Sequence, residues 1–328
     1  MRQPIKGMSV GKWYLFHEGH ELLLNYAQNN CDLLDILVGD NPDYNVSAEI
    51  RASWIKEMFP DANVKIINEL PIHEDSEKWA WRTRQLLGYS PDLVFSSEDY
   101  GEPYARYMGS KHVMVDRFRE TVPCSGHEIR ADIMNNFQYL APPVKAHFVY
   151  RIAVVGAEST GKTTLAHELA KKYKTVWAPE YGRIYAEGKI PELESKIWRT
   201  NEFVHISKSQ GILEDQLARD SYRVMFCDTT PNSTELWHKR YTGNRSLRVH
   251  EAAGDRQYTL YVVAGDEIPF IQDGTRDGQL IRHSMHQEFI NELKSVGLPY
   301  VVAEGDLDQR IATVSTYVDQ IIARPLSI

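Results

Sequence analysis

The chain has 328 residues, of which 42% are hydrophobic and 25% are charged, a balance typical of soluble globular proteins. This length predicts about two domains, each large enough to bury its own core. The net charge of −8 argues against a general nucleic-acid-binding surface, and no apolar run approaches the roughly 20 residues that span a bilayer.

The N-terminal segment lacks the apolar core of a secretory signal, so we expect a cytoplasmic protein. The three cysteines, Cys31, Cys124 and Cys227, lie far apart and form no CxxC pair. This spacing predicts reduced thiols rather than disulfides or a metal knuckle. From the net charge and the absence of a long apolar run, we expect small-molecule partners, no nucleic acid and no membrane. A homo-oligomer is possible.

In the first half of the chain, short apolar runs alternate with helical patterns, which predicts a parallel α/β sheet. Helices are expected between the strands, one of them capped by Ser47, and a further helix at residues 125–136. Ala141 and the two prolines after it are expected to break the pattern, so we place the domain boundary there, giving domains 1–143 and 144–328. The expected strands are residues 5–10, 32–39, 64–67, 93–96 and 112–115.

The second half of the chain shows the same alternation, so the predicted fold class is α/β with two parallel-sheet domains. A helical stretch is expected around residues 203–213 and a terminal helix at about 307–322. Residues 270–283 are polar and rich in Asp, Gly and Arg, and we expect them to form a mobile lid. The expected strands are residues 152–155, 175–178, 224–228, 260–264 and 300–303.

The strand expected at residues 152–155 runs into the glycine motif G-x4-G-K-T, and a helical pattern follows at once. In this order of strand, loop and helix, backbone N–H groups and a helix N-terminus face an anion. Lys162 would reach the β- and γ-phosphates of a nucleotide, and the Thr163 hydroxyl would bind Mg²⁺. The residues of this predicted phosphate cradle are Gly156, Glu158, Ser159, Thr160, Gly161, Lys162, Thr163 and Thr164.

A second candidate anion site lies where the first strand gives way to a helix. His17 and His20, with Gly19 between them, can converge with the helix N-terminus on one phosphate. Donors placed there would stabilise the charge that develops when a phosphate attacks the α-phosphorus of ATP. A pair of surface or zinc-binding histidines is the alternative, although no third and fourth metal ligands lie nearby in the sequence.

Segments around these two loops resemble a known family. Residues 11–20 and 124–130 are similar to the nucleotidyltransferase signatures G-x-F-x-P-x-H-x-G-H and I-S-x-T-x-x-R, from which Leu15, Glu18 and His127 depart. Over nearly its whole length the chain resembles the bifunctional NadR-type enzymes of NAD biosynthesis. Further similar segments are residues 96–101, 115–119, 180–183, 228–229 and 273–276.

In that family a nicotinamide mononucleotide adenylyltransferase domain precedes a P-loop ribosylnicotinamide kinase domain. The resemblance therefore implies a Rossmann-like nucleotidyltransferase domain followed by a P-loop kinase domain. Its enterobacterial members begin with a helix-turn-helix, whereas this sequence starts directly at the first catalytic strand. We therefore expect no repressor function.

For the first domain, the resemblance implies that His17, His20, Ser125 and Arg130 act on the phosphates of ATP. Trp79 and Trp81 are candidates for stacking on the cationic pyridine ring, and packing in the core is the alternative. The other expected nucleotide-binding residues of this domain are Gly11, Lys12, Trp13, Gly19, Asp116 and Arg119.

For the second domain, the resemblance implies that Asp228 holds Mg²⁺ together with Thr163. Glu180 is expected to accept the proton of the ribose 5′-hydroxyl, and Asp228 is its rival for that role. Tyr181 and Arg183 would contact ribose or pyridine. In the expected lid, Arg276 would close on the transferred phosphoryl group.

The main hypothesis is a bifunctional enzyme that phosphorylates nicotinamide riboside with ATP and adenylylates the product to NAD. The alternative is a P-loop nucleoside kinase whose N-terminal domain binds nucleotide with weak or regulatory activity, because His127 replaces a threonine that could bind phosphate. A third reading, an NAD-sensing regulatory protein, is disfavoured by the acidic charge balance. The sequence leaves the choice between amide and acid pyridines open.

Overall fold

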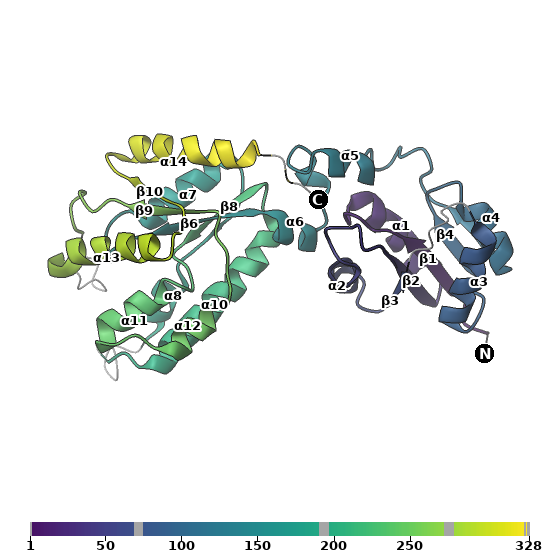
Figure 1. Cartoon of the computed structure of the whole chain (residues 1–328), viewed down its shortest axis with the longest axis horizontal. Coiled ribbons are helices and arrows are strands. Elements are labelled where there is room, and N and C mark those ends of the chain that lie inside the picture. Colours follow the sequence, from purple (N-terminus) through teal and green to yellow (C-terminus); the bar gives the residue numbers. More distant parts are fainter. Residues whose placement is uncertain (1, 69–74, 190–196, 272–278, 325, 327–328) are drawn as a thin grey trace. The chain divides into compact units, whose positions relative to one another are not determined.

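The computed structural model describes residues 2–68, 75–189, 197–271, 279–324 and 326, which form two compact units (Figure 1). Unit 1 runs through Val144, and unit 2 comprises Lys145–Arg324. Each unit contains one five-stranded sheet with helices on both faces. This architecture confirms the predicted α/β class.

The sheet of unit 1 has the strand order β3-β2-β1-β4-β5, and all its strands are parallel. Its inner strands are buried on both faces, which explains the nearly continuous apolar runs that predicted them. The chain reverses its direction of travel across the sheet between β1 and β4, and the carboxyl edge of such a pair opens a crevice for ligands. The strands are β1 (Lys6–Gly11), β2 (Leu33–Asp40), β3 (Asn63–Asn68), β4 (Leu93–Ser96) and β5 (Lys111–Met114).

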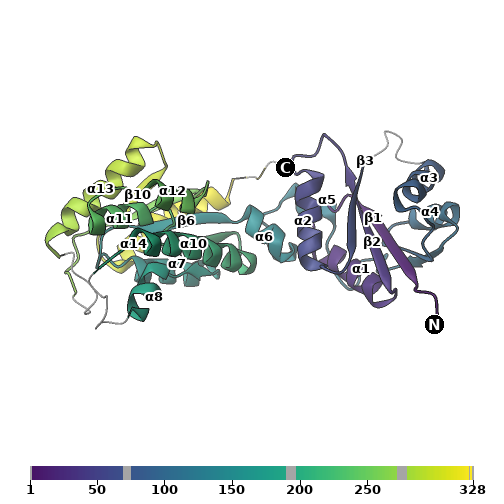
Figure 2. The same ribbon diagram turned by 90° about the horizontal axis from the view of Figure 1, so that it is seen from below.

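Helices cover both faces of this sheet (Figure 2). Helices α3 and α4 pack on one face around Met8, Val94 and Tyr104, and α1 and α2 lie on the other. Ser47 caps α2 as predicted, because its side chain accepts the N–H of Ile50. The helices are α1 (Glu18–Asn29), α2 (Ala48–Met58), α3 (Ser76–Leu87), α4 (Gly101–Met108), α5 (Gly126–Ala131) and α6 (Pro142–Phe148).

Two secondary-structure predictions in this region are wrong. The helix expected at residues 125–136 ends at Ala131, because the Asp132 carboxylate accepts the backbone N–H of Asn135 at 3.0 Å and competes with the helical pattern. Pro142 and Pro143, expected to break the pattern, instead begin α6. Proline is tolerated there because a residue in the first turn has no helical partner for its N–H.

The sheet of unit 2 is also parallel and has the order β10-β9-β6-β8-β7, with β6 at its centre. The strand expected at residues 175–178 is confined to its last two residues. The Thr175 hydroxyl donates to the carbonyl of Val224 and accepts the N–H of Tyr222 at 2.9 Å, so a side chain replaces the ladder there. The strands are β6 (Tyr150–Val155), β7 (Trp177–Ala178), β8 (Val224–Asp228), β9 (Leu260–Ala264) and β10 (Tyr300–Ala303).

Helices α7 and α14 cover one face of this sheet and enclose an apolar core around Leu165, Phe226 and Val318. Helices α10 and α12 lie on the other side of the sheet (Figure 1). The helices are α7 (Lys162–Tyr173), α8 (Tyr181–Gly188), α10 (Thr200–Leu217), α11 (Thr234–Thr242), α12 (Leu247–Ala253), α13 (Arg282–Ser295) and α14 (Leu307–Ile322).

The segment expected to be a lid lies partly outside the described residues, since residues 272–278 are not described. Arg282 and His283, which were expected to belong to the lid, instead begin α13, after the short 3-10 helix Gln279–Ile281. Within the described part of the chain, no helix combines the length and the apolar character needed to cross a membrane.

Candidate active sites

Residues 12–17 of unit 1, called the histidine loop below, follow β1 and lead into α1. His17 caps that helix, because its Nδ1 accepts the backbone N–H of Gly19 at 3.1 Å. The proton of the neutral ring therefore sits on Nε2, which is buried and has no hydrogen-bond partner among the described residues. The ring of His20 stacks on that of His17 with centroids 3.8 Å apart, so the two imidazoles lie together as predicted.

Burial decides the charge of this pair. Burial, with smaller contributions from the nearby Arg119 and Arg130, lowers the pKa of His17 to about 4. Burial also lowers the pKa of His20 well below its usual value, and His17 adds to that effect. Both rings are therefore neutral at pH 7. The Nε2–H of His17 can be donated to an anion, while the positive charge of the site comes from the two arginines.

Residues of the first signature shape the loop beside the histidines. Trp13 has a positive φ of 50°, its indole N–H donates to the Leu37 carbonyl at 2.8 Å, and its ring meets His20 edge-on at 5.0 Å. A side chain at Gly11 would come within 3.1 Å of that indole. Lys12 is exposed and lies 5.7 Å from the ring centroid of Tyr44.

Helix α5 brings the second signature to the same place. The guanidinium of Arg130 donates to the carbonyl of Tyr14, and a Cβ at Gly126 would lie 3.0 Å from Arg130 Nη1 and 3.7 Å from His17 Nε2. The Ser125 hydroxyl is engaged locally, since it donates to the Glu128 carboxylate at 2.7 Å and accepts the Glu128 N–H at 3.2 Å. Arg130 thus lies beside His17, whereas Ser125 acts as a helix cap.

The loop after β5 brings Arg119 close enough to influence His17. Asp116 shapes this loop, because its carboxylate accepts the backbone N–H groups of Glu120, Thr121 and Val122 at 3.0, 3.3 and 3.3 Å.

The two candidate stacking tryptophans lie on α3. Trp79 is half-buried and packs against the core cluster, whereas Trp81 is 59% exposed. Residues two apart on a helix point to different sides, so at most one of them can face a given ring. Stacking on pyridine remains a prediction for this pair.

Arg51 of α2 has a role that the sequence did not reveal, because an arginine in an amphipathic helix normally faces solvent. Its side chain is 0% exposed. The guanidinium donates to the carbonyls of Val46 at 3.1 Å, Gly39 at 2.9 Å and Lys12. It thereby ties the histidine loop to the end of β2.

The phosphate cradle of unit 2 has the predicted strand, loop and helix. Gly156 and Gly161 have φ values of 141° and 78°, and a Cβ at Gly156 would lie 3.1 Å from the carbonyl of Ala264. The ammonium of Lys162 is buried and donates to the carbonyl of Ala157 at 2.8 Å. The side chain of Thr164 is exposed on the first turn of α7.

Thr163 and Asp228 are brought together at the carboxyl ends of the strands. The Thr163 hydroxyl donates to Asp228 Oδ2 at 2.5 Å, and Oδ1 is buried without a hydrogen bond among the described residues. Burial raises the pKa of Asp228, while Lys162 and Thr163 lower it. A hydroxyl beside a carboxylate with a spare oxygen is a donor set that Mg²⁺ accepts, so these residues fit the metal predicted here.

Glu180 follows β7 and begins α8 on the same edge of the sheet. Burial raises the pKa of Glu180, the charge of Lys162 opposes the rise, and Asp228 adds to it. Tyr181, the next residue, places its hydroxyl 3.1 Å from His205 Nε2, and Arg183 pairs with Glu187 at 3.0 Å. The structure thus brings the two rival bases close to one lysine. Arg276 lies outside the described residues.

Arginines that the sequence analysis did not identify contact Glu158 and Ser159 of the phosphate cradle. Arg240 of α11 pairs with Glu158 at 2.6 Å. Arg282 donates to the carbonyl of Ser159 at 2.9 Å, and the Ser159 hydroxyl accepts the N–H of Ile271 at 2.8 Å.

A buried arginine also lies behind the loop. Arg310 of α14 is 3% exposed and donates to the carbonyls of Thr160 at 2.6 Å, Gly265 at 3.1 Å and Gly305 at 2.9 Å. It also pairs with Glu267 at 2.7 Å. This single side chain joins the loop to the ends of β9 and β10.

Sequence reasoning also missed an aromatic cluster next to the cradle. Trp198 lies between Tyr241 and Tyr185, with ring centroids 5.3 and 6.2 Å away. Lys162 Nζ lies 6.0 Å from the ring centroid of Trp237, whose buried indole N–H has no partner among the described residues. A count of aromatic residues could have suggested such a cluster, but the four come from three separate segments.

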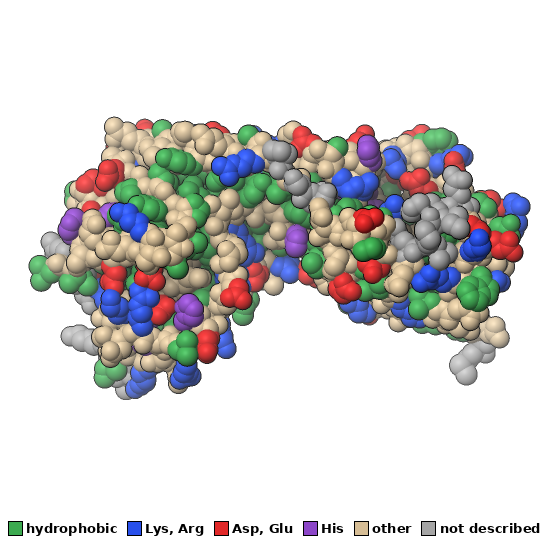
Figure 3. Space-filling view, viewed as in Figure 1, with side chains coloured by type: hydrophobic (Ala, Val, Ile, Leu, Met, Phe, Trp, Pro, Cys, Tyr) green, Lys and Arg blue, Asp and Glu red, His purple; other side chains and the backbone are tan. Residues whose placement is uncertain are grey.

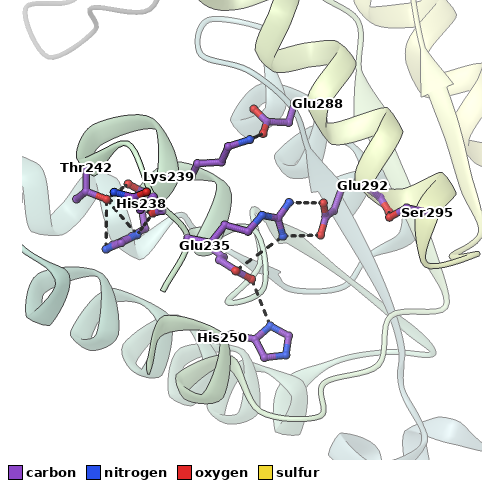
Figure 4. Close-up of polar contacts among 10 residues, drawn as sticks. Glu235, His238, Lys239, Thr242, His250, Glu288, Glu292 and Ser295 are labelled. Carbon is purple, nitrogen blue, oxygen red and sulfur yellow. Dashed lines mark hydrogen bonds and ion pairs between the residues drawn. The ribbon is translucent and has the colours of Figure 1, made fainter. Parts of the chain in front are cut away.

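Ion pairs fix α11, which carries two of these rings. Figure 4 shows Lys239 paired with Glu288 of α13, and Glu292 of the same helix held by a bidentate guanidinium. That guanidinium belongs to Arg245, which also lies 3.8 Å from Glu235. Two of the four aromatic rings therefore lie on α11, a helix that ion pairs connect to α13.

Comparisons with known proteins find similar sequences and folds. A family model described as an AAA domain matches residues 151–310. A curated protein of Escherichia coli (strain K12), named trifunctional NAD biosynthesis/regulator protein NadR, is 28% identical over 93% of this chain and 80% of its own length. The protein of the same name from Salmonella typhimurium (strain LT2) is 27% identical over 94% of this chain and 81% of its own length.

Two solved structures share the fold over nearly the whole chain. One is a NadR protein in complex with NAD and AMP-PNP, with a TM-score of 0.71, 18% identity, and 99% of each chain covered. The other is a NadR protein in complex with NR, with a TM-score of 0.73, 19% identity, and 99% of this chain and 98% of that chain covered.

Fold and loops together define a protein of two parallel-sheet units, one with a nucleotidyltransferase-type histidine loop and one with a P-loop. The likeness in sequence and fold extends across both units. In sequence and in fold, the chain is similar to proteins named NadR.

A first prediction concerns the acid stability of unit 1. Folding holds the pKa of His17 at about 4, below the ordinary 6.5, so between these values the unfolded chain takes up a proton that the folded state resists. This contribution to stability should be complete above about pH 6.5 and fall by up to about 3 kcal/mol as the pH drops to 4. Hydrogen exchange of amides in β1 and β2, compared at each pH between wild type and His17→Gln, measures it. An equal fall in both proteins would contradict the assignment.

A second prediction concerns Arg310. Arg310→Leu leaves three loop carbonyls without their donor, so affinity for a non-hydrolysable ATP analogue should fall by about tenfold or more. Arg310→Lys keeps the charge but loses the planar fork, and should recover only part of that affinity. Calorimetric titration of the full chain measures both. Wild-type affinity in a folded Arg310→Leu protein would show that the loop does not depend on this side chain.

Proposed function

We propose that the chain is a bifunctional enzyme of NAD biosynthesis. Unit 2 transfers the γ-phosphoryl group of ATP to nicotinamide riboside, and unit 1 transfers the adenylyl group of a second ATP to the resulting mononucleotide, releasing pyrophosphate. The observation that carries this proposal is that one chain builds both a histidine loop with a buried N–H donor and a P-loop with a carboxylate pair. The names of the relatives, which mention NAD biosynthesis, NAD and NR, support the choice of substrates.

In unit 2, the 5′-hydroxyl oxygen of the riboside attacks the γ-phosphorus, the bond from that phosphorus to the β–γ bridging oxygen breaks, and ADP leaves. Lys162 holds the β- and γ-phosphates. Thr163 and Asp228 would hold Mg²⁺, which neutralises phosphate charge when bound. Glu180 takes the hydroxyl proton, because Asp228 is already engaged by the Thr163 hydroxyl, and its raised pKa suits a base near neutral pH.

The aromatic cluster supports the riboside as the acceptor. The pyridine of the riboside is a flat cation, and aromatic faces bind such cations. Trp198 and Tyr241 lie on the side of the P-loop that Glu158 and Arg240 connect to α11. The indole N–H of Trp237, which has no hydrogen-bond partner among the described residues, can donate to a substrate oxygen.

In unit 1, a phosphate oxygen of the mononucleotide attacks the α-phosphorus of ATP and pyrophosphate leaves. His17 and His20 act as neutral donors, and Arg130 and Arg119 supply positive charge to the phosphates. No group in unit 1 has to lose a proton, because the attacking phosphate is already ionised.

The proposed partners are therefore small molecules, and the proposed location is the cytoplasm. On the face shown in Figure 3, basic and acidic side chains are interspersed over both units rather than gathered into one basic field. Such a surface gives no electrostatic support to nucleic-acid binding.

A third prediction separates the two reactions. Lys162→Ala should abolish phosphorylation of the riboside and leave conversion of added mononucleotide to NAD intact. His20→Ala should do the opposite, so that mononucleotide accumulates while NAD formation falls by about 10²- to 10³-fold. Chromatography of products from riboside, ATP and Mg²⁺ measures both.

Each variant is the control for the other, because each leaves the opposite reaction running. Loss of both reactions in a folded Lys162→Ala protein would refute the two-site proposal. Unchanged NAD formation in His20→Ala would show that the histidine pair is structural.

A fourth prediction concerns His127, which is exposed on the first turn of α5, two residues after Ser125. If His127 binds an ATP phosphate, KM for ATP in adenylylation should differ between wild type and His127→Thr. KM for ATP in riboside phosphorylation is the internal control and should stay the same in both proteins. Equal KM values for adenylylation would place His127 outside the phosphate site.

A further inference from the structure

Glu180, the base of the proposed kinase reaction, is weakly anchored by its own strand. Strand β7 contains only Trp177–Ala178, lies at the edge of the sheet and pairs with β8 alone. Glu180 is the N-cap residue of α8, and its side chain makes no capping hydrogen bond. Another contact must therefore set where this carboxylate lies relative to Lys162.

That contact comes from Gln210 on the neighbouring helix α10. The side-chain oxygen of Gln210 accepts the backbone N–H of Tyr181 at 2.8 Å, which is the first N–H of α8 and the one adjacent to Glu180. Gln210 is 1% exposed. A buried glutamine thus does from another helix what an N-cap side chain ordinarily does.

The orientation of the Gln210 amide is fixed from its other side. Its Nε2 donates to Glu214 Oε1 at 3.1 Å, one turn further along α10, and Glu214 Oε2 accepts the hydroxyl of Tyr258 at 2.7 Å. Glu214 is 0% exposed and Tyr258 is 5% exposed. Because the Tyr181 N–H can only donate, Gln210 must present oxygen to it, and this requires an acceptor on the nitrogen side.

Burial of the Glu214 carboxylate within this chain of contacts is energetically unfavourable. Burial raises the pKa of Glu214 to about 7, against the lowering effect of Tyr258, Gln210, Arg256 and Arg151. A carboxyl group placed where its charged form is disfavoured needs a compensating role. Its neighbour Asp215 already pairs with Arg256 at 2.7 Å, so Glu214 is not needed to balance that guanidinium.

We propose, on the basis of the kinase function above, that Gln210 is a positioning residue for Glu180 and that Glu214 and Tyr258 hold its amide in the required orientation. These three residues, Gln210, Glu214 and Tyr258, are called the relay below, and the relay acts on the phosphoryl-transfer step. It does not contact the ATP phosphates, so it should change kcat rather than KM for ATP.

The test is a double-mutant cycle in the full chain. Gln210→Leu keeps the volume and removes the acceptor, and should lower kcat for riboside phosphorylation by about 10- to 100-fold with KM for ATP within about twofold. In a Glu180→Gln background the same change should lower the residual rate by less than about twofold, since the base it positions is already gone. If Gln210 had a purely structural role, Gln210→Leu would instead lower the rate by the same factor in the wild-type and Glu180→Gln backgrounds.

Two further variants keep the test decisive. Tyr258→Phe removes one hydroxyl, is less disruptive than Gln210→Leu, and should lower kcat by about threefold, again only when Glu180 is present. Asp215→Asn, on the same helix but outside the relay, is the matched control and should leave kcat within about twofold. If Gln210→Leu does not fold, the cycle with Tyr258→Phe decides.

Wild-type kcat in folded Gln210→Leu, or multiplied losses in the cycle, would overturn the relay. A wild-type protein that phosphorylates no nicotinamide riboside would instead overturn the proposed function. The relay is then read from hydrogen exchange at the Tyr181 amide, which should speed up in Gln210→Leu and Tyr258→Phe but not in Asp215→Asn. Unchanged exchange would refute it.

Discussion

A backbone that turns its N–H groups toward an anion turns its carbonyl groups away, and buried carbonyls need donors of their own. In both units a buried arginine supplies them. Arg51 donates to the carbonyls of Lys12 and Gly39 behind the histidine loop, and Arg310 to those of Thr160 and Gly265 behind the P-loop. The planar guanidinium has five N–H groups, so one side chain can join several strand ends. The shape of each anion site depends on this contact.

The two sites then use different electrostatics. In unit 1, burial removes the charge of His17 and His20, so the positive charge near this loop comes from Arg119 and Arg130. In unit 2, the buried ammonium of Lys162 is balanced by carboxylates whose own pKa values are raised by the same burial. A phosphate bound as proposed would compete with protein carboxylates in unit 2. In unit 1 it would meet the Nε2–H of His17, which has no hydrogen-bond partner among the described residues.

The acceptor side of unit 2 is assembled from helices rather than from the sheet. Helices α8, α10 and α11 carry Tyr185, Phe203 and Tyr241, and Trp198 lies just before α10. Polar contacts fix this arrangement: Gln210 holds the start of α8, and Lys239 joins α11 to Glu288 of α13. The rings are thus placed by hydrogen bonds and ion pairs formed between separate helices.

The sequence by itself determined the elements whose signal is local. Glycine spacing predicted the cradle around Lys162, alternation predicted both parallel sheets, and Ser47 was recognised as a cap, because each rests on backbone geometry or burial within a few residues. Only the tertiary structure decided the charge of His17, the local use of Ser125 and the buried positions of Arg51, Arg310 and Glu214. Those depend on segments far apart in the chain that exclude water and exchange hydrogen bonds, and neither effect leaves a periodic trace in the sequence.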